Sequence, residues 1–201
     1  MRALELAAVP SAAQAESAIT ITPEAPILPI GASAPPFEGL LGVDGRRRSF
    51  WDFADRSVLV VVFSSNRCPT AKAYAERLRT LQAEYGPRGV QLVLINSNDP
   101  HLYPEESYPR MVERAREDGY TFPYLMDEDQ RVARAYGPTR TFEAFALDRD
   151  RRLRYAGRFD DARLAERVTS TDLANALDDL LAGREIALPR TRAFGCSLDL
   201  V

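Results

Sequence analysis

The chain has 201 residues, of which 45% are hydrophobic and 27% charged, as expected of one globular domain. Its 26 basic and 29 acidic residues leave a formal charge of -3, without the basic excess that binding to nucleic acid requires. The longest apolar run, 58–63, is far shorter than the roughly 20 residues of a membrane-spanning helix. One histidine and two cysteines are too few for a structural zinc site. We therefore expect no nucleic acid partner, no membrane span and no metal.

Composition divides the chain into three parts. Residues 1–26 are rich in alanine and in proline, which blocks long helices, so we expect a flexible arm there. Residues 27–183 carry the patterned segments of one domain, and 184–201 form a C-terminal tail that we expect to dock on it. The apolar stretch at the N-terminus is broken by Glu5, whereas a secretory signal has a longer uncharged stretch. A cytoplasmic protein is therefore expected, with an exported or periplasmic one as the alternative if this N-terminus is a signal.

The elements of the first half predict an α/β fold. Short apolar pieces separated by glycine and aspartate predict a small hairpin in 37–50. Residues 57–64 are almost unbroken valine, leucine and phenylalanine, which is typical of a strand buried on both faces. Apolar residues then recur at helical spacing over 71–85, and 90–95 is a second buried strand. This strand–helix–strand unit implies a right-handed crossover between two parallel strands.

The second half adds helices and another hairpin. Capping residues Ser107 and Asp127 predict two helices, which end before Gly119 and at Gly137. Two apolar segments flank a charged turn in 143–155 and indicate a hairpin. Leucines at helical spacing then predict a last amphipathic helix in front of the tail.

The turn between the first buried strand and the following helix carries the candidate chemistry. Its residues are Ser65, Asn66, Arg67, Cys68 and Pro69. The unpaired N–H groups and the positive dipole end of a helix start stabilise a thiolate, and Arg67 adds a cation, so Cys68 is a candidate redox-active or nucleophilic thiol. Pro69 fits the first helical turn because its missing N–H is not needed there. The alternative is that Cys68 is a small apolar residue packed under the turn.

Four segments of the sequence resemble one known family. They are Asn66-x-Cys68-Pro69, Tyr103–Ser107, Thr121–Tyr124 and Gly195–Ser197. Together with the buried strand and the crossover, they resemble the peroxiredoxin-like redoxins (AhpC/TSA domain) of the thioredoxin superfamily over residues 27–201. The resemblance implies a thioredoxin-like fold, in which helices flank a central mixed β-sheet, with an N-terminal β-hairpin extension and a C-terminal tail.

The resemblance also implies an activity. Members of this branch are thiol-dependent oxidoreductases and antioxidants, so the expected substrate is a hydroperoxide or a disulfide and the expected reductant is an external thiol. Cys68 would pass through a sulfenic acid with a peroxide, or through a mixed disulfide with a disulfide. No metal, nucleotide or other cofactor is implied, and a homodimer is compatible with the family.

Departures from the family pattern fall on catalytic positions. Ala71 stands where a thioredoxin has the second cysteine of Cys-x-x-Cys, so a neighbouring thiol cannot resolve Cys68. Ser65 meets the Thr/Ser-x-x-Cys spacing of peroxiredoxins, but Val61 replaces the proline expected seven residues before Cys68. The residues that the resemblance nevertheless assigns to the catalytic turn are Cys68, Pro69, Ser65, Asn66 and Arg67.

A second anchor of the superfamily precedes the strand predicted in 143–147. Thioredoxins have a cis-proline there and peroxiredoxins an arginine, whereas this chain has Phe142 after Thr141. A cis bond without proline costs about 2.5–4 kcal/mol, so we expect a trans peptide. Arg140 either turns toward Cys68 as a supporting group or is an ordinary surface arginine, and the second interpretation is favoured.

Cys196 lies in the tail and has two interpretations. As a resolving thiol it reaches Cys68 and closes a disulfide, and as a packed residue it pins the tail. Phe194, Leu198 and Leu200 give the tail its own reason to dock, which favours the packed role. The leading hypothesis is therefore an oxidoreductase with a single reactive thiol at Cys68. The alternative is a catalytically silent thioredoxin-fold module that binds a partner or a ligand.

Overall fold

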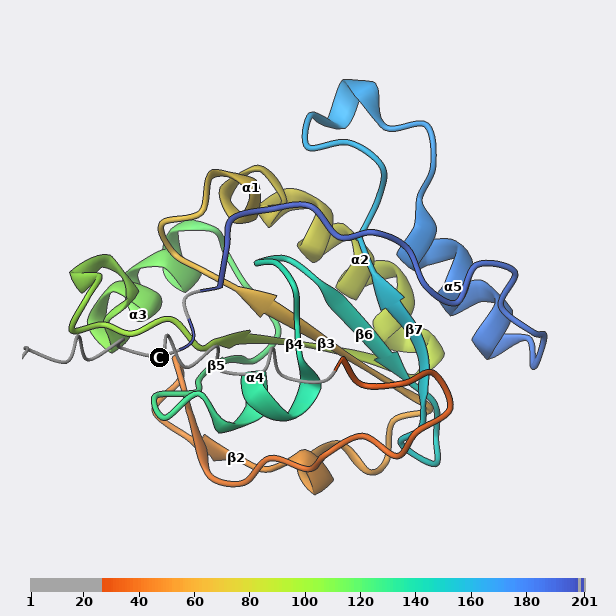
Figure 1. Cartoon of the computed structure of the whole chain (residues 1–201), viewed down its shortest axis with the longest axis horizontal. Coiled ribbons are helices and arrows are strands. Elements are labelled where there is room, and N and C mark those ends of the chain that lie inside the picture. Colours follow the sequence, from red (N-terminus) through yellow and green to blue (C-terminus); the bar gives the residue numbers. More distant parts are fainter. Residues whose placement is uncertain (1–26, 199, 201) are drawn as a thin grey trace, which may run out of the picture.

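The computed structural model describes residues 27–198 and residue 200, which form one seven-stranded sheet with helices on both faces (Figure 1). The strand order is β2-β1-β5-β4-β3-β6-β7. β3 pairs in parallel with β4, and β4 with β5, whereas the other neighbours are antiparallel. This confirms the predicted α/β class with a central mixed sheet. The arm predicted for 1–26, and the question of a signal there, lie outside the described residues.

The strands follow the hydrophobic pattern of the sequence. Their bounds are β1 Leu40–Gly42, β2 Arg47–Arg48, β3 Val58–Ser64, β4 Val90–Asn96, β5 Tyr124–Met126, β6 Ala144–Leu147 and β7 Leu153–Gly157. β3 and β4 form the centre, in register from Val58 opposite Val90 to Ser64 opposite Asn96. Every residue of β3 is buried, because both faces of the sheet are covered. The carboxyl end of β3 is where an open α/β sheet places its site.

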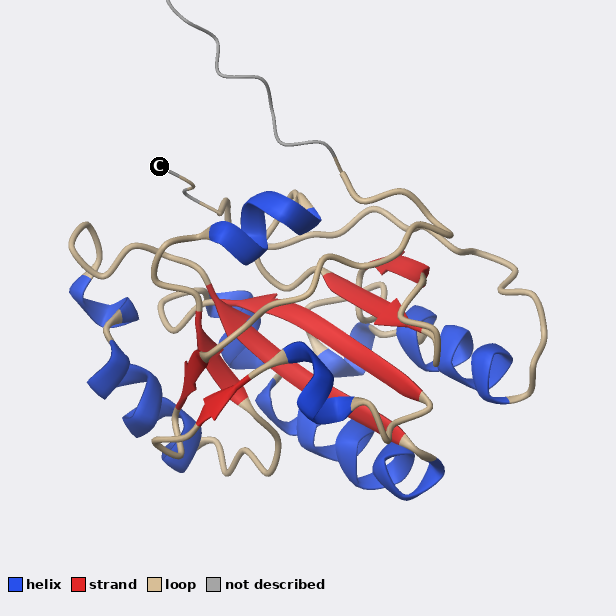
Figure 2. Cartoon of the chain, turned by 90° about the horizontal axis from the view of Figure 1, so that it is seen from below, coloured by secondary structure: helices blue, strands red, loops and turns tan. Residues whose placement is uncertain are grey.

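The helices cover the two faces of the sheet differently (Figure 2). Their bounds are α1 Pro69–Ala73, α2 Ala75–Tyr85, α3 Tyr108–Glu117, α4 Arg131–Tyr136 and α5 Asp172–Leu181. One core joins α2, α3 and α5 to the sheet through Leu78, Met111 and Leu173. The core on the opposite face joins α4 to the segment 28–53 that precedes β3. Among the described helices, none has the length and apolar character to cross a membrane.

The helix predicted over 71–85 is broken at Tyr74, where α1 ends and α2 begins. The N–H of Tyr74 donates to the Ala71 carbonyl at 3.2 Å, which is a tight turn and not an α-helical bond. The buried Tyr74 hydroxyl donates to Asp160, which also pairs with Arg77. Asp160 lies 86 residues along the chain, so helical periodicity does not reveal this contact at the break.

Both predicted hairpins form, but the sequence pattern does not predict β5. The pairs β1–β2 and β6–β7 are antiparallel, as expected. β5 has only three residues and follows Pro123, and it is a strand because β1 and β4 pair with it from both sides. The predicted cap at Asp127 acts on α4, since its carboxylate accepts the N–H groups of Val132 and Ala133.

Candidate functional site

Cys68 lies where the carboxyl end of β3 meets α1. It is the N-cap residue of α1, with extended backbone (φ -68°, ψ 119°), and Pro69 is the first helical residue. The Cys68 side chain is fully buried, whereas Pro69 is exposed. The backbone N–H groups of Ala71 and Thr70 act to lower the pKa of the Cys68 thiol. These are the unpaired donors that the start of a helix offers to an anion.

A buried carboxylate holds the turn in front of Cys68. Glu106, from the short 3-10 helix before α3, has no exposed surface. It accepts hydrogen bonds from the Ser65 hydroxyl, from the Asn66 N–H at 2.7 Å and from the Arg67 N–H at 3.3 Å. The Ser65 oxygen in turn accepts the N–H of Cys68 at 3.2 Å. A distant part of the chain therefore fixes the turn.

The C-terminal tail brings Cys196 to Cys68. In Figure 1 the dark blue tail returns from α5 across the end of the sheet that carries α1. The Thr141 N–H donates to the Cys196 carbonyl at 2.8 Å, and Cys196 packs against the hydrophobic cluster that contains Cys68, whose pKa its side chain lowers. A Cβ at Gly195 would lie 2.0 Å from the Thr141 oxygen, so only glycine fits this approach. This close approach of Gly195 to Thr141 places Cys196 next to Cys68.

The two thiols have pKa values shifted in opposite directions. Burial alone raises the pKa of Cys68, but hydrogen bonds from the Cys196 thiol and from the N–H groups of Ala71, Cys196 and Thr70 outweigh it, and the net pKa lies below the ordinary value. Burial and the adjacent Cys68 sulfur raise the pKa of Cys196 to about 11. The first proton therefore leaves Cys68, and Cys196 remains a thiol that donates to the thiolate.

Phe142 occupies the position where the superfamily has proline or arginine. Its peptide bond is trans, as predicted, and its φ of 74° lies in the left-handed region that bulky residues rarely adopt. The buried Phe142 ring lies 4.4 Å from the Tyr74 ring and 6.1 Å from the Phe159 ring, measured between centroids. Cys68 belongs to the same hydrophobic cluster of buried residues.

The two arginines singled out in the sequence have different partners. The Arg67 guanidinium lies over the Tyr103 ring at 3.4 Å and 3.9 Å from a Glu106 oxygen, and its charge acts to lower the pKa of Cys196 against the larger effect of burial. Arg140 is exposed and donates to the Ser197 hydroxyl at 3.2 Å. Arg140 therefore holds the tail, which fits the interpretation as a surface residue.

Glu106 and Asp160 are structural partners of the site that sequence reasoning missed. Glu106 stands beside the exposed Glu105, and an acidic pair in a loop is usually solvated. Asp160 follows the last strand and shows no pattern of its own. Their bonds to Ser65 and Tyr74 span 41 and 86 residues, so only the fold reveals them. The one available signal for Glu106 is its place in the family-like segment after β4.

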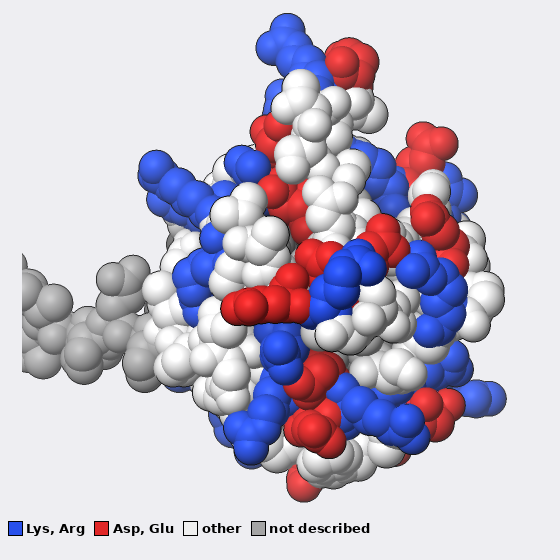
Figure 3. Space-filling model, turned by 90° about the vertical axis from the view of Figure 1, so that its right-hand side faces the viewer, with Lys and Arg blue, Asp and Glu red and all other residues white. Residues whose placement is uncertain are grey.

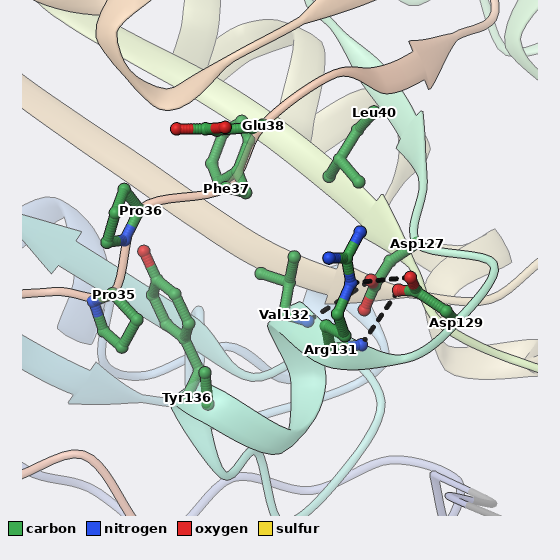
Figure 4. A pocket seen from close by; sticks show the side chains of 11 residues that line it. Pro35, Pro36, Phe37, Glu38, Leu40, Asp127, Asp129, Arg131, Val132 and Tyr136 are labelled. Carbon is green, nitrogen blue, oxygen red and sulfur yellow. Dashed lines mark hydrogen bonds and ion pairs between the residues drawn. The ribbon is translucent and has the colours of Figure 1, made fainter.

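A pocket of about 310 Å³ lies between the segment before β1 and α4 (Figure 4). Its apolar walls include Pro36, Phe37, Val132 and Tyr136, and the Asp129–Arg131 ion pair lies at its edge. None of the candidate catalytic residues lines it, so we do not assign it to the reaction. In the part of the chain that the structure describes, no cluster of three or more His, Cys, Asp or Glu could hold a metal ion.

The surface charges on the face drawn in Figure 3 do not favour long-range electrostatic attraction of a charged partner. Positive and negative side chains are interspersed there, and neither sign forms a large continuous area. Because a long-range field needs a charge of one sign to dominate, this face does not favour a highly charged partner.

The fold and the thiol at the start of α1 define a redoxin, and the chain belongs to the Redoxin family, whose model matches residues 29–177. Two curated relatives are thiol-disulfide oxidoreductases ResA. The protein of Geobacillus thermodenitrificans is 26% identical over 121 residues, which cover 60% of this chain and 64% of the relative. That of Halalkalibacterium halodurans is 31% identical over 75 residues, covering 37% and 39%. The matches thus span less than two thirds of either relative.

Solved structures match over a longer part of the chain. A hypothetical protein from Sinorhizobium meliloti 1021 is 38% identical, with a TM-score of 0.81, and the match covers 87% of this chain and 96% of that one. An uncharacterized conserved protein from Geobacillus kaustophilus is 39% identical, with a TM-score of 0.80 and coverage of 86% and 93%. Peroxidoxin BcpB from Mycobacterium tuberculosis is 21% identical, with a TM-score of 0.61 and coverage of 78% and 99%, which bears on the fold alone. The thioredoxin-like fold is confirmed.

Proposed function

We propose that this redoxin is a thiol-disulfide oxidoreductase in which Cys68 is the nucleophile and Cys196 the resolving thiol. The observation that carries the proposal is the position of Cys196, which the backbone bond to Thr141 holds near Cys68, where its side chain helps to lower the pKa of the Cys68 thiol. The name of the ResA relatives supports the reaction class. A silent binding module, the alternative, needs neither a shifted pKa nor a second thiol in contact. The contact also favours resolution by Cys196 over the packed role and over a single-thiol reaction.

The reaction consists of two successive exchanges. The Cys68 thiolate attacks one sulfur of a substrate disulfide, whose S–S bond breaks, and one substrate thiolate leaves with the electron pair while a mixed disulfide forms. Cys196 then gives up its proton, attacks the Cys68 sulfur and releases the second substrate thiolate. The substrate gains two electrons and the chain keeps a Cys68–Cys196 disulfide. An external thiol reductant returns two electrons and restores both thiols.

Access to Cys68 requires the tail to move. With the tail docked, Cys68 has no exposed surface. The polar contacts over it include the Thr141–Cys196 backbone bond of 2.8 Å and the Arg140–Ser197 bond of 3.2 Å. A typical hydrogen bond contributes about 0.5–1.5 kcal/mol net and an exposed one such as Arg140–Ser197 less, so the tail can lift without unfolding the domain. The substrate enters as Cys196 withdraws, and Cys196 then returns to resolve the mixed disulfide.

A hydroperoxide is the second candidate substrate, because the same low-pKa thiol can attack an O–O bond. Cys68 would become a sulfenic acid as an alcohol leaves, and condensation with Cys196 would release water and form the same disulfide. The peroxiredoxin-like arginine is replaced by Phe142, and Arg140 is bonded to the tail. Disulfide exchange, which needs no such arginine, is therefore the better supported reaction.

Turnover assays with oxidised glutathione and with hydrogen peroxide, run in parallel, test the proposal. Dithiothreitol serves as reductant, and the wild type is compared with Cys68→Ser and Cys196→Ser. We expect the wild type to reduce the disulfide and Cys68→Ser to be inactive. Cys196→Ser, mixed with oxidised glutathione before dithiothreitol is added, should hold a glutathione adduct visible by mass spectrometry. Equal turnover by the wild type and Cys68→Ser contradicts the proposal. Peroxide turnover that exceeds disulfide turnover assigns the second candidate substrate.

A further inference from the structure

Glu106 is a fully buried carboxylate that the two exchanges above do not use. Besides its three donors in the turn, the Asn96 side-chain amide donates to it at 2.9 Å. The Arg67 guanidinium adds a charge partner at 3.9 Å. Both carboxylate oxygens are thereby hydrogen-bonded, which is the condition for burying a charged group.

The turn donors act on the backbone that leads directly into Cys68. The successive N–H groups of Asn66 and Arg67 converge on one carboxylate, which fixes the orientation of both peptide units. The Ser65 hydroxyl donates to Glu106 and accepts the Cys68 N–H, so it links the carboxylate to the cysteine. The direction of the Cys68 side chain follows from these bonds.

The end of β4 holds Glu106 in turn. The Asn96 amide that donates to Glu106 also accepts a hydrogen bond from the Asn98 amide at 2.8 Å, and Asn98 donates to the Ser64 carbonyl at 3.2 Å. These side chains are buried. The carboxylate is therefore part of a polar network that ties the ends of β3 and β4 together, and a satisfied buried network of this kind is rigid.

We propose that Glu106 is a positioning residue for Cys68: its carboxylate holds the turn 65–67 in the arrangement that aims the Cys68 sulfur at the N–H groups of α1 and at Cys196. The proposal rests on the function proposed for the two thiols and names a residue that this function requires. Glu106 acts through the turn and not on the substrate.

The charge of Glu106 acts in the opposite direction to its positioning role. A nearby carboxylate disfavours a thiolate, and Glu106 contributes to the raised pKa of Cys196. The charge of Arg67, on the turn itself, acts on the pKa of Cys196 in the opposite direction. Removal of the negative charge alone would make the Cys68 thiolate form more readily, whereas loss of the turn geometry would make it form less readily. The two roles therefore predict effects of opposite sign.

Titration of the Cys68 thiolate in Cys196→Ser protein separates these roles. The far-ultraviolet absorbance of the thiolate is followed against pH and corrected with the Cys68→Ser, Cys196→Ser double variant. Glu106→Gln keeps the size of the side chain but presents a donor to groups that are themselves donors. Positioning predicts that the midpoint rises by about one pH unit, which is a roughly tenfold loss of thiolate below both midpoints. Glu105→Gln makes the same charge change on an exposed neighbour and should leave the midpoint unchanged.

Two results overturn the proposal. A lower midpoint in Glu106→Gln shows that its charge, and not its positioning, dominates. An unchanged midpoint in a folded variant with a lower unfolding temperature assigns Glu106 a merely structural role. If Glu106→Gln does not fold, Ser65→Ala cuts the link to Cys68, and its midpoint must rise as well for the proposal to stand. Because ionisation is measured and not turnover, the result is independent of whether Cys68 reduces a disulfide.

Discussion

The two cysteines belong to regions that are held in place by different kinds of contact. Cys68 lies in a buried turn whose backbone is bonded to Glu106 and to the start of α1. Cys196 lies in a half-buried tail that a backbone bond to Thr141 and the exposed Arg140 hold in place. A nucleophile benefits from a fixed position that keeps its thiolate stabilised, whereas a resolving thiol has to leave and return. This contrast between a fixed turn and a movable tail is the physical basis of the proposed redox cycle.

Removing the thiol of the fixed region should have the largest effect. Cys68→Ser should lower disulfide turnover on the order of a thousandfold or more, because a serine hydroxyl is not ionised near neutral pH. Steady-state turnover with oxidised glutathione measures the loss, and circular dichroism checks that the fold is intact. Cys196→Ser is the matched control, since it keeps the first exchange and loses only the second. Wild-type turnover in Cys68→Ser would refute the assignment of the nucleophile.

Undocking the tail should have the next largest effect. In Gly195→Ala the new Cβ would lie 2.0 Å from the Thr141 oxygen, so the tail must shift. We expect the intramolecular disulfide to form at least about tenfold more slowly, and iodoacetamide to alkylate Cys68 faster than in the wild type. Gly86→Ala is the control, because its Cβ meets only the flexible Gln82 side chain. The same behaviour in both variants would mean that the close backbone contact does not seat Cys196.

The contact between Cys196 and Cys68 should also make the stability of the fold depend on pH. The pKa of Cys196 is raised to about 11 in the folded chain from an ordinary 9.0. The unfolded chain binds the Cys196 proton less tightly than the folded chain does. The contribution of this proton to the free energy of unfolding is therefore fully present below pH 9 and is lost as the pH rises through the pKa of the folded chain. Urea unfolding of the wild type should therefore lose on the order of 1 kcal/mol more than Cys196→Ser across this window. Parallel losses in both proteins would place Cys196 in an ordinary environment.

Arg140→Ala should have the smallest effect. Arg140 is exposed and its bond to Ser197 is a surface interaction, so the free energy of unfolding should change by less than about 0.5 kcal/mol. Turnover of oxidised glutathione and of hydrogen peroxide should each change by less than about twofold. Selective loss of peroxide turnover in this variant would instead assign Arg140 the role of a peroxide-binding arginine.

The parts of the fold that could be predicted have local causes. β3 and β4 are continuous apolar runs, and the β6–β7 hairpin combines two apolar segments with a charged turn. The break at Tyr74 has no sign in the helical periodicity, and the Tyr74 hydroxyl there bonds to Asp160, 86 residues away. β5 could not be predicted from its own three residues either, because it is a strand only through its pairing with β1 and β4.

In the candidate site, too, features with a local cause could be predicted and features that depend on distant residues could not. The position of Cys68 could be predicted because a buried strand, a Cys-Pro step and helical spacing occur in succession. The contact with Cys196 could not, because it depends on how closely Gly195 approaches Thr141, and the apolar Leu198 argued for packing alone. Glu106 was hidden because its carboxylate acts on a turn 41 residues earlier. Local chemistry predicts the candidate nucleophile, whereas the contacts of Glu106 and Cys196 with its surroundings appear only in the tertiary structure.

Peptide mapping under non-reducing conditions, after one equivalent of oxidised glutathione, tests the pairing of fixed turn and movable tail most directly. The proposed cycle predicts a Cys68–Cys196 disulfide within a single chain and release of both glutathione thiols. A stable glutathione adduct on Cys68, with Cys196 still a free thiol, would contradict it.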